Sequence, residues 1–107
     1  MESTPKPPKV YQEFVSHYPK LAEAWDTIAE AGSAGPLDEK TVRLIKLAIA
    51  IGAMREGAVH ASIRKALAMG IALEELGQVV ALAAGTLGLP STVAIYSWVK
   101  DVLNKES

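Results

Sequence analysis

The sequence contains no cysteine among its 107 residues. Without a thiol, the chain forms no disulfide, no thiolate metal site and no sulfenate, so cysteine-dependent catalysis is excluded. Only two histidines are present, His17 and His60. Because they lie far apart in the sequence and no cluster of carboxylates accompanies them, we expect neither a metal ion nor another cofactor.

Aromatic residues are also scarce, at 6% of the chain, whereas half of all residues are hydrophobic. The core must therefore consist of Ala, Leu, Ile and Val, and an alanine-rich composition of this kind favours helices. No segment with turn signals on both sides alternates between apolar and polar residues in the manner of a strand. We predict an all-α fold of five or six helices, with one domain over residues 10–107 and a flexible, proline-containing arm over residues 1–9.

The sequence also has no large excess of positive or of negative residues. Eleven Lys and Arg residues oppose twelve Asp and Glu residues, which gives a net charge of -1. No basic run is present, so the electrostatic signature of nucleic-acid binding is absent and we expect no nucleic-acid partner. The polar N-terminus shows no apolar signal segment, and we therefore expect a cytoplasmic location.

One stretch without charged residues, residues 78–99, is long enough to span a bilayer. Its middle contains Gly85, Gly88 and Pro90 together with several hydroxyl side chains. These residues would break a spanning helix and leave polar groups in lipid. We predict two buried helices joined by a turn, over residues 73–86 and 91–103, and no contact with a membrane.

Residues typical of helix ends divide the first part of the chain. Pro19 is expected to end a short helix that begins near Val10 and to form the first turn of a second helix, which Gly32 closes. Asp38 is a good N-cap for a third, long helix. We expect this third helix to continue, after a kink at Gly57, to a C′ glycine at position 70.

The third helix is apolar on all sides between Leu47 and Met54. A helix of this kind is enclosed either by its own core or by a neighbouring subunit. A chain of 107 residues cannot cover so much apolar surface by itself, because small domains leave a large share of their surface exposed. We therefore predict that the protein forms a homo-oligomer.

Three polar residues follow this apolar segment. Glu56, His60 and Arg64 follow at i, i+4 and i+8, so a helix places them on one face within reach of one another. A carboxylate one turn from an imidazole fixes its tautomer and raises its pKa, which suits a general acid or base. The alternative is a ladder of ion pairs at a subunit interface, without catalytic function.

Three segments in this order resemble a known family: LDEKTVRLIKLA, REGAVHASIRKALAMG and VVALAAGTLGLP, all within residues 37–99. The sequence resembles the carboxymuconolactone decarboxylase family, which also contains the alkylhydroperoxidase D-like proteins. The resemblance implies an all-α fold, assembly as a homotrimer or homohexamer, and sites near the interfaces between subunits.

The resemblance also shows where this chain departs from its family. The hydroperoxidase-like branch uses a glutamate, two cysteines and a histidine, and the corresponding positions here are Arg43, Arg55, Ala58 and Ser62. The decarboxylase branch carries an R-E-x-x-x-x-x-H-x-R motif, of which Arg55, Glu56 and Arg64 match while Ser62 replaces the histidine. A further branch carries EGAVH, as this chain does, followed by a second histidine that is lost here.

Two functions are consistent with these residues. The first is an enzyme that acts on a small carboxylated, lactone or carbonyl compound, with His60 as acid or base and Glu56 orienting it. Its substrate site would include Arg55, Arg43, Arg64 and Ser62, because arginines bind a carboxylate in bidentate fashion. The second is a non-catalytic oligomeric binding or scaffold protein that has kept the assembly of the family and lost its chemistry.

Overall fold

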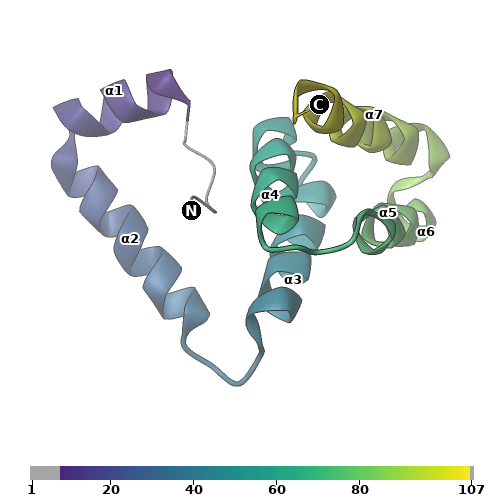
Figure 1. Cartoon of the computed structure of the whole chain (residues 1–107), viewed down its shortest axis with the longest axis horizontal. Coiled ribbons are helices and arrows are strands. Elements are labelled where there is room, and N and C mark those ends of the chain that lie inside the picture. Colours follow the sequence, from purple (N-terminus) through teal and green to yellow (C-terminus); the bar gives the residue numbers. More distant parts are fainter. Residues whose placement is uncertain (1–7, 107) are drawn as a thin grey trace.

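The computed structural model describes residues 8–106, and the prediction of an all-α fold is confirmed for this part of the chain (Figure 1). The expected flexible arm falls almost wholly outside the described residues, and the first helix begins at Lys9. The helices are α1 (Lys9–His17), α2 (Pro19–Ser33), α3 (Glu39–Gly52), α4 (Glu56–Ala68), α5 (Leu73–Leu82), the single turn α6 (Ala84–Leu87) and α7 (Leu89–Glu106).

Helices α3 to α7 form the body of the molecule. Helices α3 and α4 pack side by side, α7 covers α4, and α5 lies between α3 and α7 (Figure 1). The core between them consists of aliphatic side chains, as the composition predicts. Its largest fully buried members are Leu47, Ile51, Val59, Ile63, Leu76 and Ile95.

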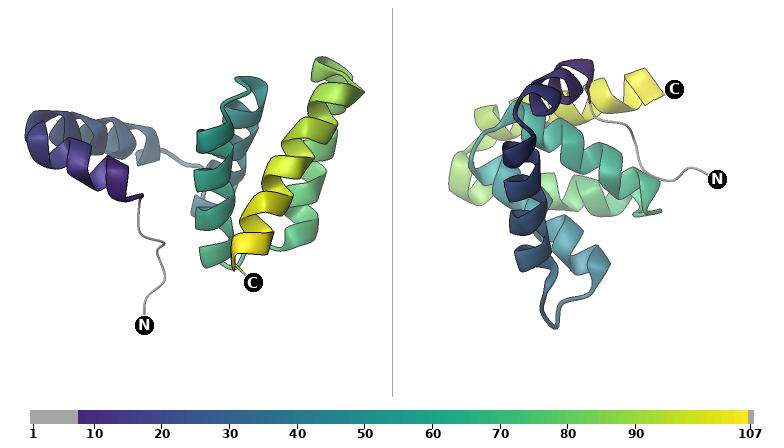
Figure 2. Two further views of the ribbon diagram at one scale, coloured as in Figure 1. Left: turned by 90° about the horizontal axis from the view of Figure 1, so that it is seen from above. Right: turned by 90° about the vertical axis from the view of Figure 1, so that its left-hand side faces the viewer.

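Helices α1 and α2 form a separate N-terminal helix pair. Pro19 occupies the first turn of α2, as predicted, and turns the chain between the two helices. The left view in Figure 2 shows this pair standing apart from the body, to which residues 34–38 connect it. Over residues 9–33, all of which the structure describes, no side chain is buried. Apolar residues such as Trp25 (60% exposed) and Ile28 (62% exposed) therefore face solvent.

Of the remaining expected helix boundaries, two prove correct and two are wrong. Asp38 caps α3 by accepting a hydrogen bond from the backbone N–H of Thr41 at 2.9 Å, and Gly70 follows α4 with a φ of +84°. Gly32, in contrast, lies inside the last turn of α2, which continues to Ser33. The chain also does not kink at Gly57, because α3 already ends at Gly52.

The turn between α3 and α4 has the geometry of a Schellman motif. The N–H of Arg55 bonds to the carbonyl of Ala50, and the N–H of Met54 bonds to the carbonyl of Ile51. Met54 adopts a φ of +56°, the left-handed conformation that this motif requires and that glycine usually supplies. The turn reverses the chain and separates α4 from α3, so Arg55 and Glu56 stand at the start of a new helix.

The uncharged stretch near the C-terminus contributes to three helices, whereas the sequence predicted two. The helix expected over residues 73–86 ends at Leu82, the short α6 follows, and α7 begins at Leu89, so that Pro90 lies in its first turn. Among the described residues, no helix is both long enough and apolar enough to cross a membrane.

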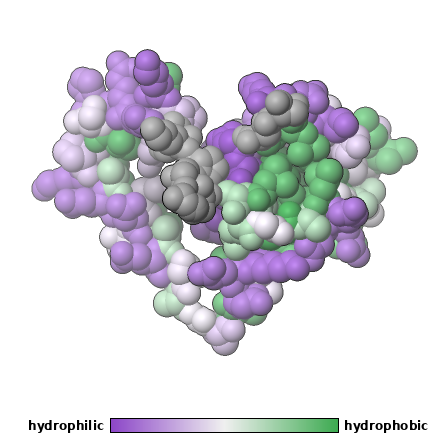
Figure 3. All heavy atoms as spheres, in the orientation of Figure 1, coloured by the Kyte–Doolittle hydropathy of each residue, from purple (hydrophilic) through white to green (hydrophobic). Residues whose placement is uncertain are grey.

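The body leaves much of its apolar surface uncovered. Figure 3 shows a broad hydrophobic area over the region where α4, α5 and α7 meet. On α3, Leu47, Ala50 and Ile51 are buried, but Ile49 faces solvent, so the single chain does not enclose this helix on all sides. A groove of about 420 Å³ with a largely apolar lining runs between α3, α5 and α6.

Candidate functional site

Helix α4 places the predicted polar residues on one face. It begins at Glu56 and stays regular to Ala68, so Glu56, His60 and Arg64 lie one turn apart along it. The prediction that these three residues share a helical face is therefore confirmed. The same face turns toward the C-terminal half of α7, which packs against α4.

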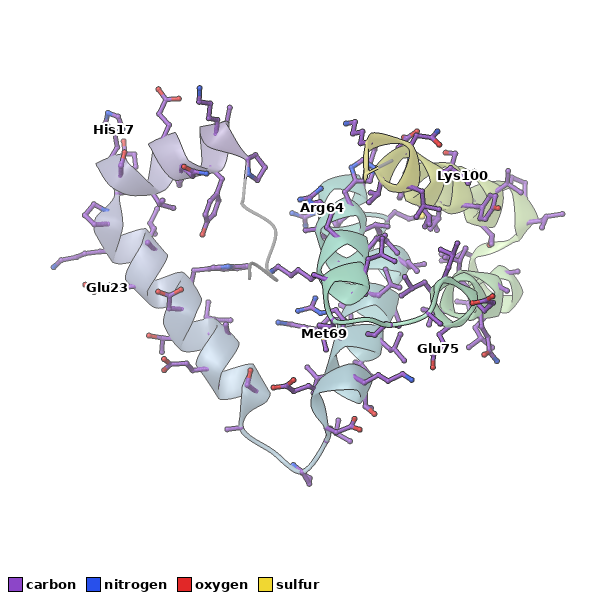
Figure 4. The ribbon with its side chains drawn as sticks, viewed as in Figure 1. His17, Glu23, Arg64, Met69, Glu75 and Lys100 are labelled. Atoms are coloured by element: carbon purple, nitrogen blue, oxygen red, sulfur yellow. The ribbon has the colours of Figure 1, made fainter. Side chains whose placement is uncertain are left out.

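His60 and Arg64 line a small pocket at the junction of α4 and α7, which we call the His60 pocket. Its volume is about 110 Å³, and its other lining residues are Asp101, Val102 and Lys105. Figure 4 shows Arg64 on the part of α4 that lies close to the C-terminal end of α7. The pocket thus brings together one imidazole, one carboxylate and two cationic side chains from two helices.

The imidazole of His60 is poorly satisfied where it lies. Its Nε2 atom is buried and has no hydrogen-bond partner among the residues that the structure describes. The nearest carboxylate oxygen, Oε2 of Glu56, is 3.7 Å away, which is too long for a hydrogen bond. Only 21% of the His60 side chain is exposed, against 53% for Glu56. Glu56 and His60 are therefore within ion-pair distance of each other but form no hydrogen bond, and Nε2 lacks an acceptor among the described residues.

Three of these groups are of the kinds that bind metal ions. One nitrogen of His60 and one carboxylate oxygen each from Glu56 and Asp101 lie within 4.8 Å of one another. A histidine with two carboxylates is a ligand set that divalent metals accept. However, Arg64 and Lys105 line the same pocket and offset the charge of the two carboxylates. The two positive charges cancel the two negative ones, so the site has no net charge with which to attract a bare cation.

The other residues predicted for the site lie elsewhere. Arg55 is exposed at the N-cap of α4 and does not line the His60 pocket. Ser62 is 7% exposed and belongs to the buried side of α4, because two residues along a helix rotate a side chain by about 200°. Arg43 lines a different hollow, between the end of α2 and the first half of α3. Of the predicted substrate-binding residues, the structure brings only Arg64 to His60.

Asp101 and Lys105 are the site residues that the sequence analysis missed. They stand one turn apart on α7, so their spacing alone places them on a common face. That signal was available in the sequence, although many solvated helices carry the same pattern. What the spacing does not reveal is that this face of α7 meets α4 at His60.

The comparison with known proteins identifies the family. The model of the carboxymuconolactone decarboxylase family matches residues 19–101. The chain therefore belongs to this family, and it is a member without cysteine. The chain matches no curated protein and no solved structure.

Proposed function

We propose that this protein is an enzyme that acts on a small carboxylated, lactone or carbonyl compound by acid/base chemistry. The observation that carries the proposal is the buried, unpartnered Nε2 of His60 beside two cationic side chains in one pocket. A buried nitrogen without a partner is costly, and a substrate that bonds to it removes this cost.

Four residues in and beside the pocket have roles in this proposal. Arg64 and Lys105 hold the carboxylate of the substrate, Arg64 through its planar fork and Lys105 as a point charge. His60 exchanges a proton with the reacting carbon or oxygen, and Glu56 orients its ring. In a decarboxylation, for example, departing CO₂ leaves an electron pair on carbon, and the imidazolium of His60 supplies the proton that this carbon takes up.

Peroxide reduction is not part of the proposal. The peroxidase chemistry of the hydroperoxidase-like branch needs two thiols, and this chain has none. The residues at the corresponding positions, Arg55 and Ala58, are exposed around the start of α4 and form no redox pair.

A non-catalytic binding or scaffold protein is the second candidate. The observation that favours it is the size of the His60 pocket, about 110 Å³, which is well below the ~300–1,000 Å³ of most small-molecule sites. In this case Glu56, His60 and Arg64 would form polar contacts with a neighbouring subunit. The family fold by itself is compatible with both functions.

Assembly with further copies of this chain, as a homotrimer or homohexamer, is also part of the proposal. It is supported by the exposed apolar side chains of α1 and α2 and by the apolar groove between α3, α5 and α6. A neighbouring subunit that lies across the His60 pocket would also enlarge and enclose it, which would bring its volume closer to that of a substrate site.

Substitutions of the two key residues test the proposed function. His60→Gln keeps the size of the side chain but cannot exchange a proton at neutral pH. We expect it to lower turnover of small lactone carboxylic acids or dicarboxylates by ~10²–10⁴-fold while sparing their binding. Arg64→Gln should weaken binding by ~1–3 kcal/mol, the scale of a lost hydrogen bond to a charged group.

The other histidine provides a matched control. His17 lies on α1, exposed and outside the His60 pocket, so His17→Gln should change neither binding nor turnover. Calorimetry measures affinity, and proton NMR of the reaction mixture measures turnover. If His60→Gln and Arg64→Gln leave both quantities unchanged in an intact oligomer, the acid/base proposal fails and the scaffold function is the better explanation.

A further inference from the structure

A second group of cationic side chains lies away from the His60 pocket. Arg43 and Lys46 stand one turn apart on α3, and Lys65 projects from the neighbouring α4 near enough to interact with both. Within residues 8–106, none of these three cations takes part in an ion pair. By contrast, Lys40, on the same helix, is paired with Glu75.

Arg43 is the least satisfied of the three. It is half-buried, and its Nε atom is shielded from solvent and has no hydrogen-bond partner within residues 8–106. Glu39 precedes it by one helical turn, yet the two side chains form no ion pair in the described structure. It is unfavourable for a guanidinium nitrogen to lose its water without gaining a hydrogen-bond acceptor. A ligand that supplies an acceptor removes this free-energy penalty.

The surrounding electrostatics increase this cost. Burial lowers the pKa of Arg43 below its usual value. Burial, followed by the positive charges of Arg43, Lys46 and Arg64, lowers the pKa of Lys65. Like charges held together in a partly desolvated place repel one another, so a bound anion would stabilise all of them.

Arg43 and Lys46 line a hollow, which we call the Arg43 hollow, whereas Lys65 lies outside its lining. Its volume is about 390 Å³, within the range of metabolite sites. Leu37, Val42 and Met69 form an apolar side, whereas Arg43 and Lys46 form a cationic side, with Ser33 and Glu39 completing the lining. Figure 4 shows Met69 at the end of α4 that approaches the first turns of α3.

We propose that the Arg43 hollow binds a small organic anion, a carboxylate attached to an apolar body. The carboxylate pairs with the fork of Arg43 and with Lys46, and the apolar body lies against Leu37, Val42 and Met69. With Glu39 as the one acidic residue in the lining, the two lining cations leave a net positive charge, which matches one carboxylate. This site is separate from the His60 pocket, and the proposal goes beyond the function proposed above.

Benzoate is a suitable probe, since it joins one carboxylate to an apolar ring, and neutral benzamide is its control. We expect benzoate to bind the full-length protein more weakly as salt is added, and benzamide to bind at least ten-fold more weakly than benzoate. Arg43→Gln should lower the affinity for benzoate at least ten-fold, and Arg43→Lys should have a smaller effect. Lys20→Gln, an exposed cation on α2, should have none.

The methionines locate the bound probe. In spectra of protein with ¹³C-labelled methionine methyl groups, benzoate should shift the signal of Met69, which lines the hollow, and leave that of Met54 unchanged, because Met54 lies in the turn between α3 and α4. His60→Gln should retain the shift of Met69. Light scattering and circular dichroism verify that each variant keeps its fold and assembly, and Lys46→Gln replaces Arg43→Gln if the latter does not fold.

Three results would overturn the proposal. The first is an unchanged Met69 signal at saturating benzoate, and the second is equal binding of benzoate and benzamide. The third is an Arg43→Gln variant that dissociates the oligomer while the native protein binds no benzoate, which would mean that Arg43 pairs with a carboxylate of another subunit. None of these results bears on the turnover assays of His60→Gln, so the two proposals fail independently.

Discussion

Met54 and Gly70 occupy equivalent places in two successive turns. Each residue is the C′ position of a Schellman motif and has a positive φ, +56° for Met54 and +84° for Gly70. The left-handed conformation is unfavourable for residues with a Cβ atom and accessible to glycine. The turn after α3 is therefore strained by its methionine, whereas the turn after α4 is not.

Met54→Gly should accordingly stabilise the protein. We expect a gain of ~0.5–1 kcal/mol in the free energy of unfolding, because relief of the strain outweighs the larger entropy of the unfolded glycine chain and the loss of a partly exposed side chain. Chemical denaturation with unchanged slope measures the gain. A loss of stability would mean that packing of Met54 against other subunits outweighs its backbone strain.

The reciprocal substitution, Gly70→Ala, should destabilise the protein by about 1 kcal/mol. Apart from Gly70 and its two chain neighbours, no heavy atom of the described residues lies within 4 Å of the place where the Cβ would stand, so the effect isolates backbone strain from steric overlap. Equal melting temperatures of Gly70→Ala and the native chain would argue against the strain described for both turns.

The absence of cysteine yields a prediction of its own. Peroxide consumption with a dithiol reductant should not exceed the rate in buffer, since the chain has no thiol from which to form a sulfenate or a disulfide. The assay follows peroxide loss with and without the protein. Turnover that depends on the reductant would require another redox group and would change the interpretation of this family member.

At the scale of the helices, the N-cap of α3 is the clearest link between sequence and stability. Asp38 accepts a hydrogen bond from the N–H of Thr41, and contacts with Thr41 lower the pKa of its carboxyl. A carboxyl with a lowered pKa in the folded state stabilises the protein above its unfolded pKa of about 3.9. This stabilisation is lost as the pH falls through the lower, folded value.

Asp38→Ala should therefore lower the melting temperature at pH 7, and its difference from the native chain should shrink once the pH falls below about 4. Asp38→Asn offers a matched control, because asparagine caps helices well and does not titrate. Thermal melts at pH 7 and pH 3 distinguish the three proteins. The melting temperatures of Asp38→Ala and the native chain could instead differ by the same amount at both pH values. That result would contradict a role for the charged carboxylate.

The helix ends show what was predictable from sequence and why the remainder was not. Pro19, Asp38 and Gly70 act through their own backbone or side chain, so each could be recognised from its residue type. The end of α3 could not be recognised in this way, because the residue in the left-handed conformation is a methionine and not the glycine that usually marks a helix end. Packing of α3 against α4 compensates for this local preference.

The same distinction applies to the candidate site. The shared face of Glu56, His60 and Arg64 follows from the period of a single helix and was predictable. Asp101 and Lys105 join them only because α7 crosses α4, and helix periodicity does not specify which helices pack together. Arg43 was assigned to the same site by resemblance alone, and the structure places it in the separate Arg43 hollow.

At the scale of the whole molecule, the N-terminal helix pair is the part that we expect to form a contact between subunits. Leu21, Trp25 and Ile28 lie on one exposed face of α2, and Glu23 lies about 200° away on the opposite face (Figure 4). Burial of a large apolar side chain contributes ~1.5–3 kcal/mol, so a face of this kind strongly favours association.

Light scattering of the native chain at micromolar concentration should accordingly show no stable monomer. Trp25→Ala should shift the oligomer toward smaller species at the same concentration, whereas Glu23→Ala, on the opposite face of the same helix, should not. Either a compact folded monomer of the native chain or equal effects of the two substitutions would mean that this face is not the principal contact between subunits.

The exposed connection over residues 34–38 also has a kinetic consequence. Helices α3 to α7 join through short turns and pack against one another, so this helical body can fold rapidly within one molecule. In the described structure the apolar side chains of α1 and α2 remain exposed, and we expect them to be covered only when another copy binds. Refolding should therefore show a fast phase that is independent of protein concentration, followed by a slower phase whose rate rises with concentration and which alone changes the fluorescence of Trp25.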